Sequence, residues 1–360
     1  MRSKPTIVAS LAALALVIAS VSSTRAHKPI TSKYFYTTDV FPIFRDRCGA
    51  CHQPDGVGPM SLLTYNDARP WAQSIKDEVI NLRMPPRYAE QGFGSVRNGH
   101  GLTAREIDTI VEWANGGTPQ GPRVPDAPGD GGHAPAVSAK PDLKLELPEV
   151  TLAKDVAQET KTFTIATGLT ADRFVRHLEI EPGAPSIVRS VVISSPAGVL
   201  AAWQPGQDAL TSDRDTAYRL PAKSPLSVRI RYKKTWKQEG QAVADRTTIK
   251  LWLTDKRPAR VIERLEIVNG ADSLKQGVRL VAVVPQIPVT LDSVRVEAVR
   301  PDGSRQKLLL LTHPSPDWPA RYWFAQPVAL PAGSRIEIVS SPSQSSSGRV
   351  SLQLEYTQPS

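Results

Sequence analysis

The spacing of apolar residues changes abruptly along this chain of 360 residues, and a proline- and glycine-rich stretch marks the change. Before residue 117, apolar side chains recur every three or four positions, which predicts helices. From residue 143 onward they alternate with polar ones, which predicts strands. Between the two, eleven of the 26 residues from 117 to 142 are Pro or Gly, a composition typical of an extended linker. We therefore expect a multidomain fold, with an all-α domain followed by an all-β region.

Three helices are expected before the linker. The clearest, "LTAREIDTIVEWANGG", has a capping box from Thr103 to Glu106 and a glycine stop at Gly116. Pro70 can open the helix before it, because the first turn of a helix does not need that N–H. The first helix runs into "RDRCGACH", with Pro42 in its first turn. The linker proper is then placed at residues 119–142.

The β region is long enough for two β-sandwiches. We place the first at residues 143–255 and the second at 256–360, although no sequence repeat marks the boundary. "RPDGSR", around Asp302 and Gly303, predicts a hairpin turn.

The chain begins with a short basic segment, an apolar run from Thr6 to Val21 and small residues up to Ala26. This pattern predicts a signal peptide over residues 1–26, cleaved near Ala26; a retained anchor is the alternative. No later segment is apolar enough to span a membrane, so we expect an exported, periplasmic protein. The formal net charge of +9 is too small for its length to suggest nucleic-acid binding.

The only two cysteines, Cys48 and Cys51, directly precede His52 in "CGACH". This is the attachment motif of c-type haem: two thiols bond to the haem edge and the imidazole ligates the iron. A redox dithiol would need a βαβ context, and the flanks are helical. A structural zinc site would need a second pair of ligands, which the sequence lacks. One covalently bound haem c is therefore the expected cofactor.

Met84, in "RMPPRY", is the candidate for the second axial ligand of the iron. Two prolines follow it and would stiffen the loop that presents the sulfur. Met84 as core filler and His100 as the ligand are the alternatives. The carbonyl of Pro59 is a candidate acceptor for the other nitrogen of His52.

Taken together, "CGACH", a Gly-Pro turn, "MPP" and "IVEWANGG" make residues 33–118 resemble a class I c-type cytochrome. "GPMSLLTYNDARPWAQSIKDEV" resembles the cytochrome c module found in bacterial proteins that also carry a β domain related to copper type II, ascorbate-dependent monooxygenases. The resemblance implies that His52 and Met84 are the axial ligands.

"TADRFVRHLEIEPG" and "ARYWFAQPVALPAGSRIEI" extend the resemblance into the β region. That family binds two coppers through histidines and a methionine. Here the corresponding positions hold other residues, and no methionine follows Met84. The β region has only two histidines, His177 and His313. The resemblance is therefore to a degenerate domain lacking the copper ligands, and no copper is expected. The residues at the ligand positions are Arg189, Ser190, Arg231, Gln286 and Pro288.

These features predict an exported monohaem c-type cytochrome that transfers single electrons to or from a redox protein partner. The β region would dock a partner or assemble a complex without catalysing a reaction. Two alternatives remain open: a haem-fed oxidoreductase or monooxygenase using the β region, and a structural subunit of a larger membrane-associated redox complex. We expect an electron carrier rather than a copper monooxygenase.

Overall fold

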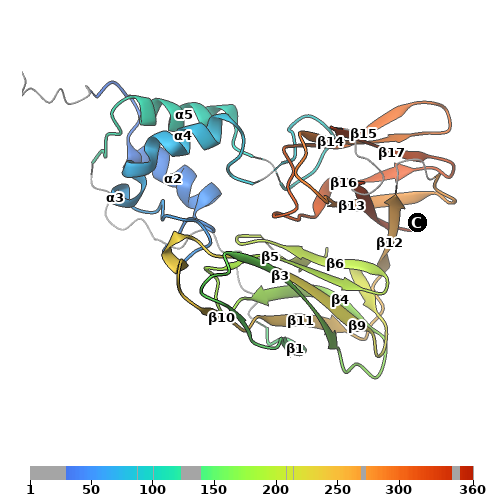
Figure 1. The fold of residues 1–360 in the computed structure, drawn as a ribbon. Coiled ribbons are helices and arrows are strands. Elements are labelled where there is room, and N and C mark those ends of the chain that lie inside the picture. The colour runs from blue at the N-terminus through green and yellow to red at the C-terminus, as the bar shows by residue number, and fades with distance from the viewer. Residues whose placement is uncertain are drawn as a thin grey trace, which may run out of the picture.

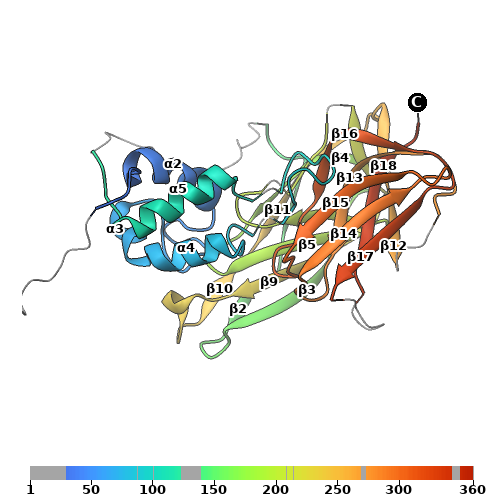
Figure 2. The same cartoon turned by 90° about the horizontal axis from the view of Figure 1, so that it is seen from above.

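A computed structural model describes residues 30–86, 88–99, 101–122, 139–207, 209–213, 215–268, 273–342 and 349–359. The predicted signal peptide over residues 1–26 lies outside the described residues, as does the middle of the predicted linker, residues 123–138. Figure 1 shows a helical part beside two β lobes, and Figure 2 shows the same arrangement from above. Within the described residues, no helix is both long and apolar enough to cross a membrane.

The helical part consists of short helices around an aromatic core. Its first helical segment begins with a π-helical turn at Tyr36–Val40, continues through the short α2 (Phe41–Ile43) and ends with a second π-helical turn at Phe44–Cys48. It is followed by α3 (Tyr65–Ala68), a 3₁₀ turn at Arg69–Trp71, α4 (Ala72–Ile80) and α5 (Ala104–Asn115). The predicted capping box and the Gly116 stop are confirmed in α5. The core includes Trp113, which is fully buried, with Tyr36 and Phe44 against it.

The first β lobe packs two layers of antiparallel strands face to face. One layer has the order β1-β11-β4-β8, with the short β7 also paired to β4, and the other has the order β3-β9-β5-β6. The small β2–β10 pair lies beside them. The strands are β1 (Leu143–Glu146), β2 (Val150–Leu152), β3 (Gln158–Ala166), β4 (Arg173–Glu181), β5 (Val188–Ser195), β6 (Gly198–Trp203), β7 (Leu210–Thr211), β8 (Thr216–Leu220), β9 (Pro225–Lys233), β10 (Val243–Asp245) and β11 (Thr248–Thr254).

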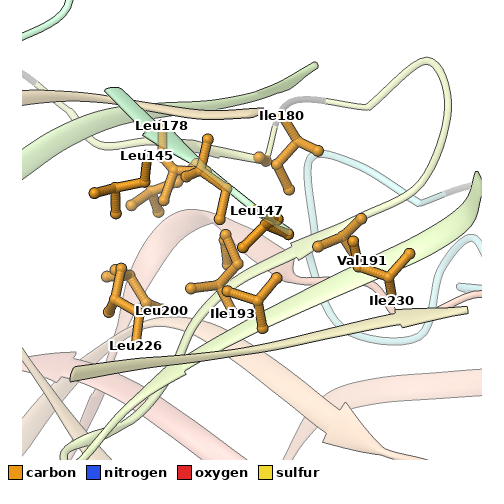
Figure 3. Close-up of a cluster of buried hydrophobic side chains, with 14 of the residues drawn as sticks. Leu145, Leu147, Leu178, Ile180, Val191, Ile193, Leu200, Leu226 and Ile230 are labelled. Atoms are coloured by element: carbon orange, nitrogen blue, oxygen red, sulfur yellow. The ribbon is translucent and has the colours of Figure 1, made fainter. Parts of the chain in front are cut away.

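Strand alternation builds the core of this lobe. In β9, Leu226, Val228 and Ile230 are fully buried, while Arg229 on the opposite face is exposed. A strand with this period places one face in the core and the other against solvent or a neighbouring lobe. Figure 3 shows the inward-facing side chains meeting between the layers: Leu145, Leu147, Leu178, Ile180, Val191, Ile193, Leu200, Leu226 and Ile230.

The second β lobe repeats this plan. One layer has the order β12-β18-β13-β16, and the other is the three-stranded sheet β15-β14-β17. The predicted Asp302-Gly303 hairpin is confirmed between β14 and β15, where Gly303 has a positive φ of 84°. The strands are β12 (Arg260–Val268), β13 (Val278–Gln286), β14 (Ser293–Val299), β15 (Arg305–Thr312), β16 (Tyr322–Leu330), β17 (Arg335–Ser341) and β18 (Ser351–Thr357).

The two β lobes share β12. It pairs in parallel with β8 of the first lobe and antiparallel with β18 of the second, so a single nine-stranded sheet runs through both. Ile262 belongs to the core of the first lobe and Ile267 to the core of the second. The sheet is therefore not interrupted at residue 256.

The expected fold class, an all-α domain followed by an all-β region, is wrong. The described chain is predominantly β with several sheets, and its longest helix, α5, has 12 residues. Residues 88–99, which were assigned to the all-α domain, instead leave the helical part and run along the second β lobe. Ala89 pairs with Leu311 and Val96 pairs with Phe324, and Ala89 and Val96 are buried in the core of that lobe. The helical part is therefore not an independent domain. We call residues 88–99 the strap.

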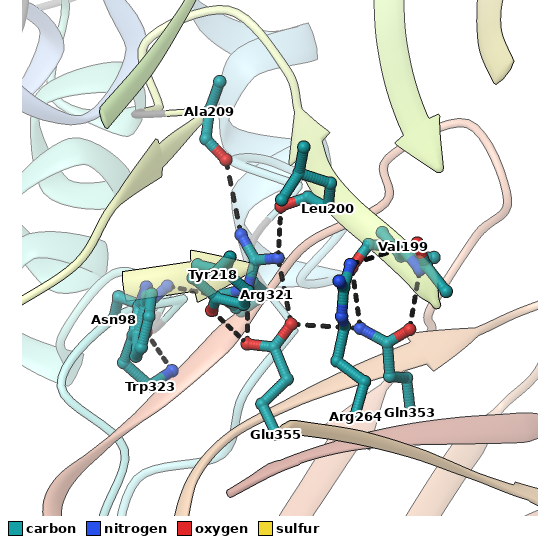
Figure 4. A network of polar contacts seen from close by, with 11 residues as sticks. Asn98, Val199, Leu200, Ala209, Tyr218, Arg264, Arg321, Trp323, Gln353 and Glu355 are labelled. Carbon is teal, nitrogen blue, oxygen red and sulfur yellow. Dashed lines mark hydrogen bonds and ion pairs between the residues drawn. The ribbon is translucent and has the colours of Figure 1, made fainter. Parts of the chain in front are cut away.

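A buried polar network joins the two β lobes (Figure 4). Glu355 of β18 accepts hydrogen bonds from Arg321 at 2.8 and 3.0 Å and from the hydroxyl of Tyr218 at 2.6 Å. Arg321 also donates to the carbonyl of Leu200 in the first lobe, at 2.7 Å. The side chain of Asn98, in the strap, donates to the carbonyl of Arg321 at 2.7 Å. The network therefore holds both lobes and the strap in one arrangement.

Candidate functional site

The candidate site is a cavity of about 250 Å³ between the helical part and the β lobes. Cys48, Cys51, His52 and Met84 all line it, so four residues from two separate sequence motifs meet in one place. Its walls are mainly apolar, with Ile75 and Val79 of α4 and the prolines after Met84 among them. We call it the CGACH cavity.

The local backbone turns the CGACH residues toward this cavity. The helical turn Phe44–Cys48 ends at the first thiol, and the carbonyl of Cys48 then accepts from the N–H groups of Cys51, at 3.1 Å, and His52, at 2.9 Å. Such i→i+3 and i→i+4 bonds bring both sulfurs and the imidazole round a single turn. The two intervening residues, Gly49 and Ala50, are small.

His52 is held by the loop that follows it. Its Nδ1 lies 3.0 Å from the carbonyl oxygen of Met60, and an N–H at Nδ1 would leave Nε2 unprotonated and able to ligate a metal. Burial lowers the pKa of His52, and the nearby Arg189 guanidinium lowers it as well, which favours the neutral imidazole that a metal requires. A side chain at Gly58 would meet the ring, because its Cβ would lie 2.7 Å from Nδ1.

The role predicted for Pro59 is corrected by this geometry. The carbonyl that faces His52 belongs to the next residue, Met60. The carbonyl of Pro59 instead accepts a hydrogen bond of 2.9 Å from the indole of Trp236, in the turn after β9. The loop therefore turns one carbonyl inward to the imidazole and the preceding one outward to the first β lobe.

Met84 reaches the cavity from the end of α4. The helix ends at Ile80, and Leu82 then takes a left-handed φ of 54°. The N–H groups of Arg83 and Met84 both bond back to the carbonyl of Glu78, at 2.9 and 3.3 Å. These bonds fold the chain over the helix end, and Pro85 and Pro86 fix its course beyond Met84.

The two β lobes contribute residues that sequence reasoning did not assign to this cavity. Arg189 of β5, Pro205 after β6 and Trp318 before β16 all line it. The guanidinium of Arg189 lies 5.1 Å from the centre of the Trp318 ring, a cation–π contact. Its Nε is buried and has no hydrogen-bond partner among the residues that the structure describes. An orphaned buried donor in a cavity indicates room for an acceptor that the protein itself does not supply.

The close fit between the helical part and the first lobe also depends on glycine. A Cβ at Gly206 would collide with the side chain of Ala50, inside the CGACH motif. Gly206 has a φ of 77°, so the backbone favours glycine for a second reason. A glycine in a loop more than 150 residues from the motif carries no sequence signal for this contact.

The remaining predicted positions lie elsewhere. His177 of β4 contacts Thr211 and Glu179, at 2.9 and 3.1 Å, and packs on Trp252. His100, the alternative axial ligand, lies outside the described residues. Of the five positions compared with copper ligands, Arg189 lines the CGACH cavity. The other four meet round a second cavity between the β lobes: Ser190, Arg231, Gln286 and Pro288.

Comparison with known proteins does not identify a family. No family model matches the chain, and no curated protein matches it. One solved structure, that of the PBSX exported protein XepA, aligns with 62% of this chain and 90% of that chain, with 9% sequence identity and a TM-score of 0.17. At these values the similarity supports no conclusion about fold or function.

The resemblance to a class I c-type cytochrome module fused to a degenerate copper type II monooxygenase-like β domain is therefore corrected. The helical part is not an independent all-α module, because the strap belongs to the second β lobe. Among the described residues, no group of three or more His, Cys, Asp or Glu side chains is placed to hold a metal ion.

Proposed function

We propose that the chain is an exported monohaem c-type electron carrier whose single haem is held in the CGACH cavity. The observation that carries this proposal is the convergence of Cys48, Cys51, His52 and Met84 on one apolar cavity. Covalent haem attachment needs two thiols and an imidazole with this spacing, rather than a cluster of ionisable metal ligands.

The residues present suit such a group. The two thiols would each add across one vinyl group, forming a C–S bond while the thiol proton passes to the neighbouring carbon. His52 would ligate the iron through Nε2, because Nδ1 faces the Met60 carbonyl. Met84 would supply a thioether from the other wall, a ligand that raises the reduction potential. The orphaned Nε of Arg189 would find an acceptor in a carboxylate of the porphyrin.

When bound, haem iron supplies one-electron chemistry by cycling between its ferric and ferrous states. The protein's contribution is to exclude water and fix the ligands. Helix α4 and the prolines after Met84 close one side of the cavity, and Arg189, Pro205 and Trp318 close another. We propose that the β lobes complete the pocket and present it to a redox protein partner, without catalysing a reaction themselves.

The proposal is tested by producing the full chain with its export signal in cells that mature c-type haem proteins. We expect one haem per chain that survives denaturing electrophoresis, because it is bonded through two sulfurs. Cys48→Ala combined with Cys51→Ala should abolish this retention. The matched control, Met60→Leu, leaves the Met60 carbonyl and both thiols in place and should retain the haem. A chain that never acquires covalent haem in such cells would refute the proposal.

A further inference from the structure

A second cavity, of about 440 Å³, lies between the two β lobes and is separate from the thiols of the CGACH cavity. One wall is the outward face of β9, which carries Arg229 and Arg231, together with Ser190 of β5. The opposite wall belongs to the second lobe and includes Gln286 at the end of β13 and the proline-rich loop from residue 314 to residue 319. We call it the interlobe cavity.

The charged side chains among the described lining residues of this cavity are arginines, although the 314–319 loop also carries Asp317. Arg229, Arg231 and Arg349 line it, and no Asp or Glu is among the described lining residues. Arg231 is neutralised by Asp317, 2.6 Å away. Within the described part of the chain, neither Arg229 nor Arg349 makes an ion pair. Two arginines thus remain available to a ligand, and a guanidinium binds a carboxylate through two parallel hydrogen bonds.

The rest of the lining favours a ligand with an apolar body. Trp318 and Tyr322 contribute aromatic surface, and several prolines surround them. Ser190 and Gln286 add uncharged groups that can donate hydrogen bonds. The volume of about 440 Å³ lies in the range of small-molecule sites, roughly 300–1,000 Å³, and leaves an inorganic ion such as phosphate mostly without contacts.

From this combination, we infer that the interlobe cavity binds a small organic carboxylate with an aromatic or otherwise apolar body. Arg229 and Arg349 hold the carboxylate, and the aromatic and proline wall covers the apolar body. Trp318 lines both cavities, so a ligand bound here lies next to the wall of the CGACH cavity. The inference goes beyond the proposed electron transfer and stands without it, since the arginines and the wall do not depend on haem.

The test is isothermal titration calorimetry of the full purified chain with benzoate, at fixed low salt. Benzyl alcohol, with the same ring and no charge, and inorganic phosphate, with charge and no ring, are titrated in parallel. We expect benzoate to bind at least about tenfold more tightly than either, because only benzoate satisfies both the arginines and the apolar wall. The measurement does not involve the iron, so it can fail or succeed independently of the haem proposal.

The variant is Arg229→Gln, which removes one available guanidinium from the exposed face of β9. Its matched control is Lys233→Gln, an equal change of charge two positions on from Arg231, on the same face of the strand and outside the cavity lining. We expect Arg229→Gln to weaken benzoate binding about tenfold or more, and Lys233→Gln to leave it within about twofold. No benzoate binding up to about 10 mM would overturn the inference, as would equal affinities in the two variants or tighter binding of phosphate than of benzoate.

Discussion

Arg321 and Glu355 form an ion pair in the interior, with the Arg321 Nε 2.8 Å from a Glu355 oxygen and both side chains almost completely buried. Arg321 lies directly before β16 and Glu355 lies in β18, yet Arg321 also bonds to the carbonyl of Leu200 in the first lobe. Removing one member of such a pair leaves an uncompensated charge in a medium of low polarity. The pair therefore contributes to the contact between the two lobes, beside the sheet that they share through β12.

We expect Glu355→Gln to lower the free energy of unfolding by about 3–5 kcal/mol, because the Arg321 guanidinium loses its counter-charge. Chemical denaturation followed by far-UV circular dichroism measures the change. The control is Arg305→Gln, which removes a guanidinium that is 53% exposed and pairs with Glu297 and Glu337. It should cost much less stability, because ion pairs of an exposed side chain contribute little. Equal losses of stability in the two variants would show that the buried Arg321–Glu355 pair stabilises the protein no more than an exposed ion pair does.

The strap gives a second prediction. Gly94 has a φ of 75°, and a Cβ there would collide with the carbonyl of Leu308 in β15. Gly92 has a similar φ of 81°, but a Cβ there would lie within 4 Å of no atom in the described part of the chain. Alanine at either position should lower the free energy of unfolding by about 1 kcal/mol, because a residue with a Cβ is strained at a positive φ. Only Gly94→Ala should add about 1–3 kcal/mol from steric overlap and make residues 88–99 more sensitive to limited proteolysis.

The strap also shows what the sequence could and could not predict. The capping box at Thr103 and the Asp302-Gly303 turn are local patterns, and the structure has both. Cys48, His52 and Met84 line one cavity, while the roles in haem binding proposed for them stay predictions. The pairing of Ala89 with Leu311 joins residues more than 200 positions apart, through backbone groups that any residue carries. No local pattern encodes such a contact, so the helical spacing around it predicts a separate domain that the structure does not have.

Arg189 illustrates the same limit at the site. Its alternation within β5 shows only that it lies on one face of a strand, and the neighbouring lobe decides what that face meets. In the structure that face meets Trp318 and the CGACH cavity. A partly buried arginine in the same cavity as two cysteines could be anticipated only from the packing of the lobes. The sequence therefore predicted the residues proposed to attach the haem and missed those that close the pocket.

Replacing Met84 tests the proposed axial ligand. Met84→Ala would remove the thioether and open the sixth coordination position, so we expect a change from a low-spin to a high-spin absorption spectrum and a lower reduction potential. Met60→Leu is the matched control, since Met60 lines the same cavity but contacts His52 through its backbone. A low-spin, methionine-type spectrum that persists in Met84→Ala would reject the assignment.

Arg189 should tune the potential of the same site. Burial lowers the pKa of Arg189, but an arginine side chain stays protonated at neutral pH, and a positive charge beside the cavity favours the reduced iron. We expect Arg189→Gln to lower the midpoint potential by an amount on the order of tens of millivolts, as measured by redox titration. Lys233→Gln makes the same change of charge away from the cavity and should shift the potential less. An unchanged midpoint potential in Arg189→Gln would show that the guanidinium has no electrostatic effect on the proposed haem.

Glu106 gives the helical part a defined dependence on pH. Burial raises its pKa, but hydrogen bonds from Thr103 and Arg47 outweigh burial and hold the pKa of this carboxyl below its ordinary value of 4.5. Thr103 donates from its backbone N–H at 2.7 Å, and Arg47, next to Cys48, donates at 3.0 Å. Because the folded pKa is the lower one, the stabilisation is complete above about pH 4.5 and is lost as the pH falls through the folded pKa.

Glu106→Gln should therefore destabilise the chain at pH 7, and the difference from the unmodified protein should shrink as the pH falls from about 4.5 through the lowered folded pKa. Urea denaturation at a series of pH values measures the difference, with tryptophan fluorescence reporting on the core of the helical part around Trp113. Glu112→Gln, on the same helix with its ion-pair oxygen facing Lys33, is the control for removing one negative charge. The loss at pH 7 should be larger for Glu106→Gln, because Glu106 also caps the first turn of α5. A difference from the unmodified protein that stays constant down to pH 3 would show that Glu106 acts through packing rather than through its charge.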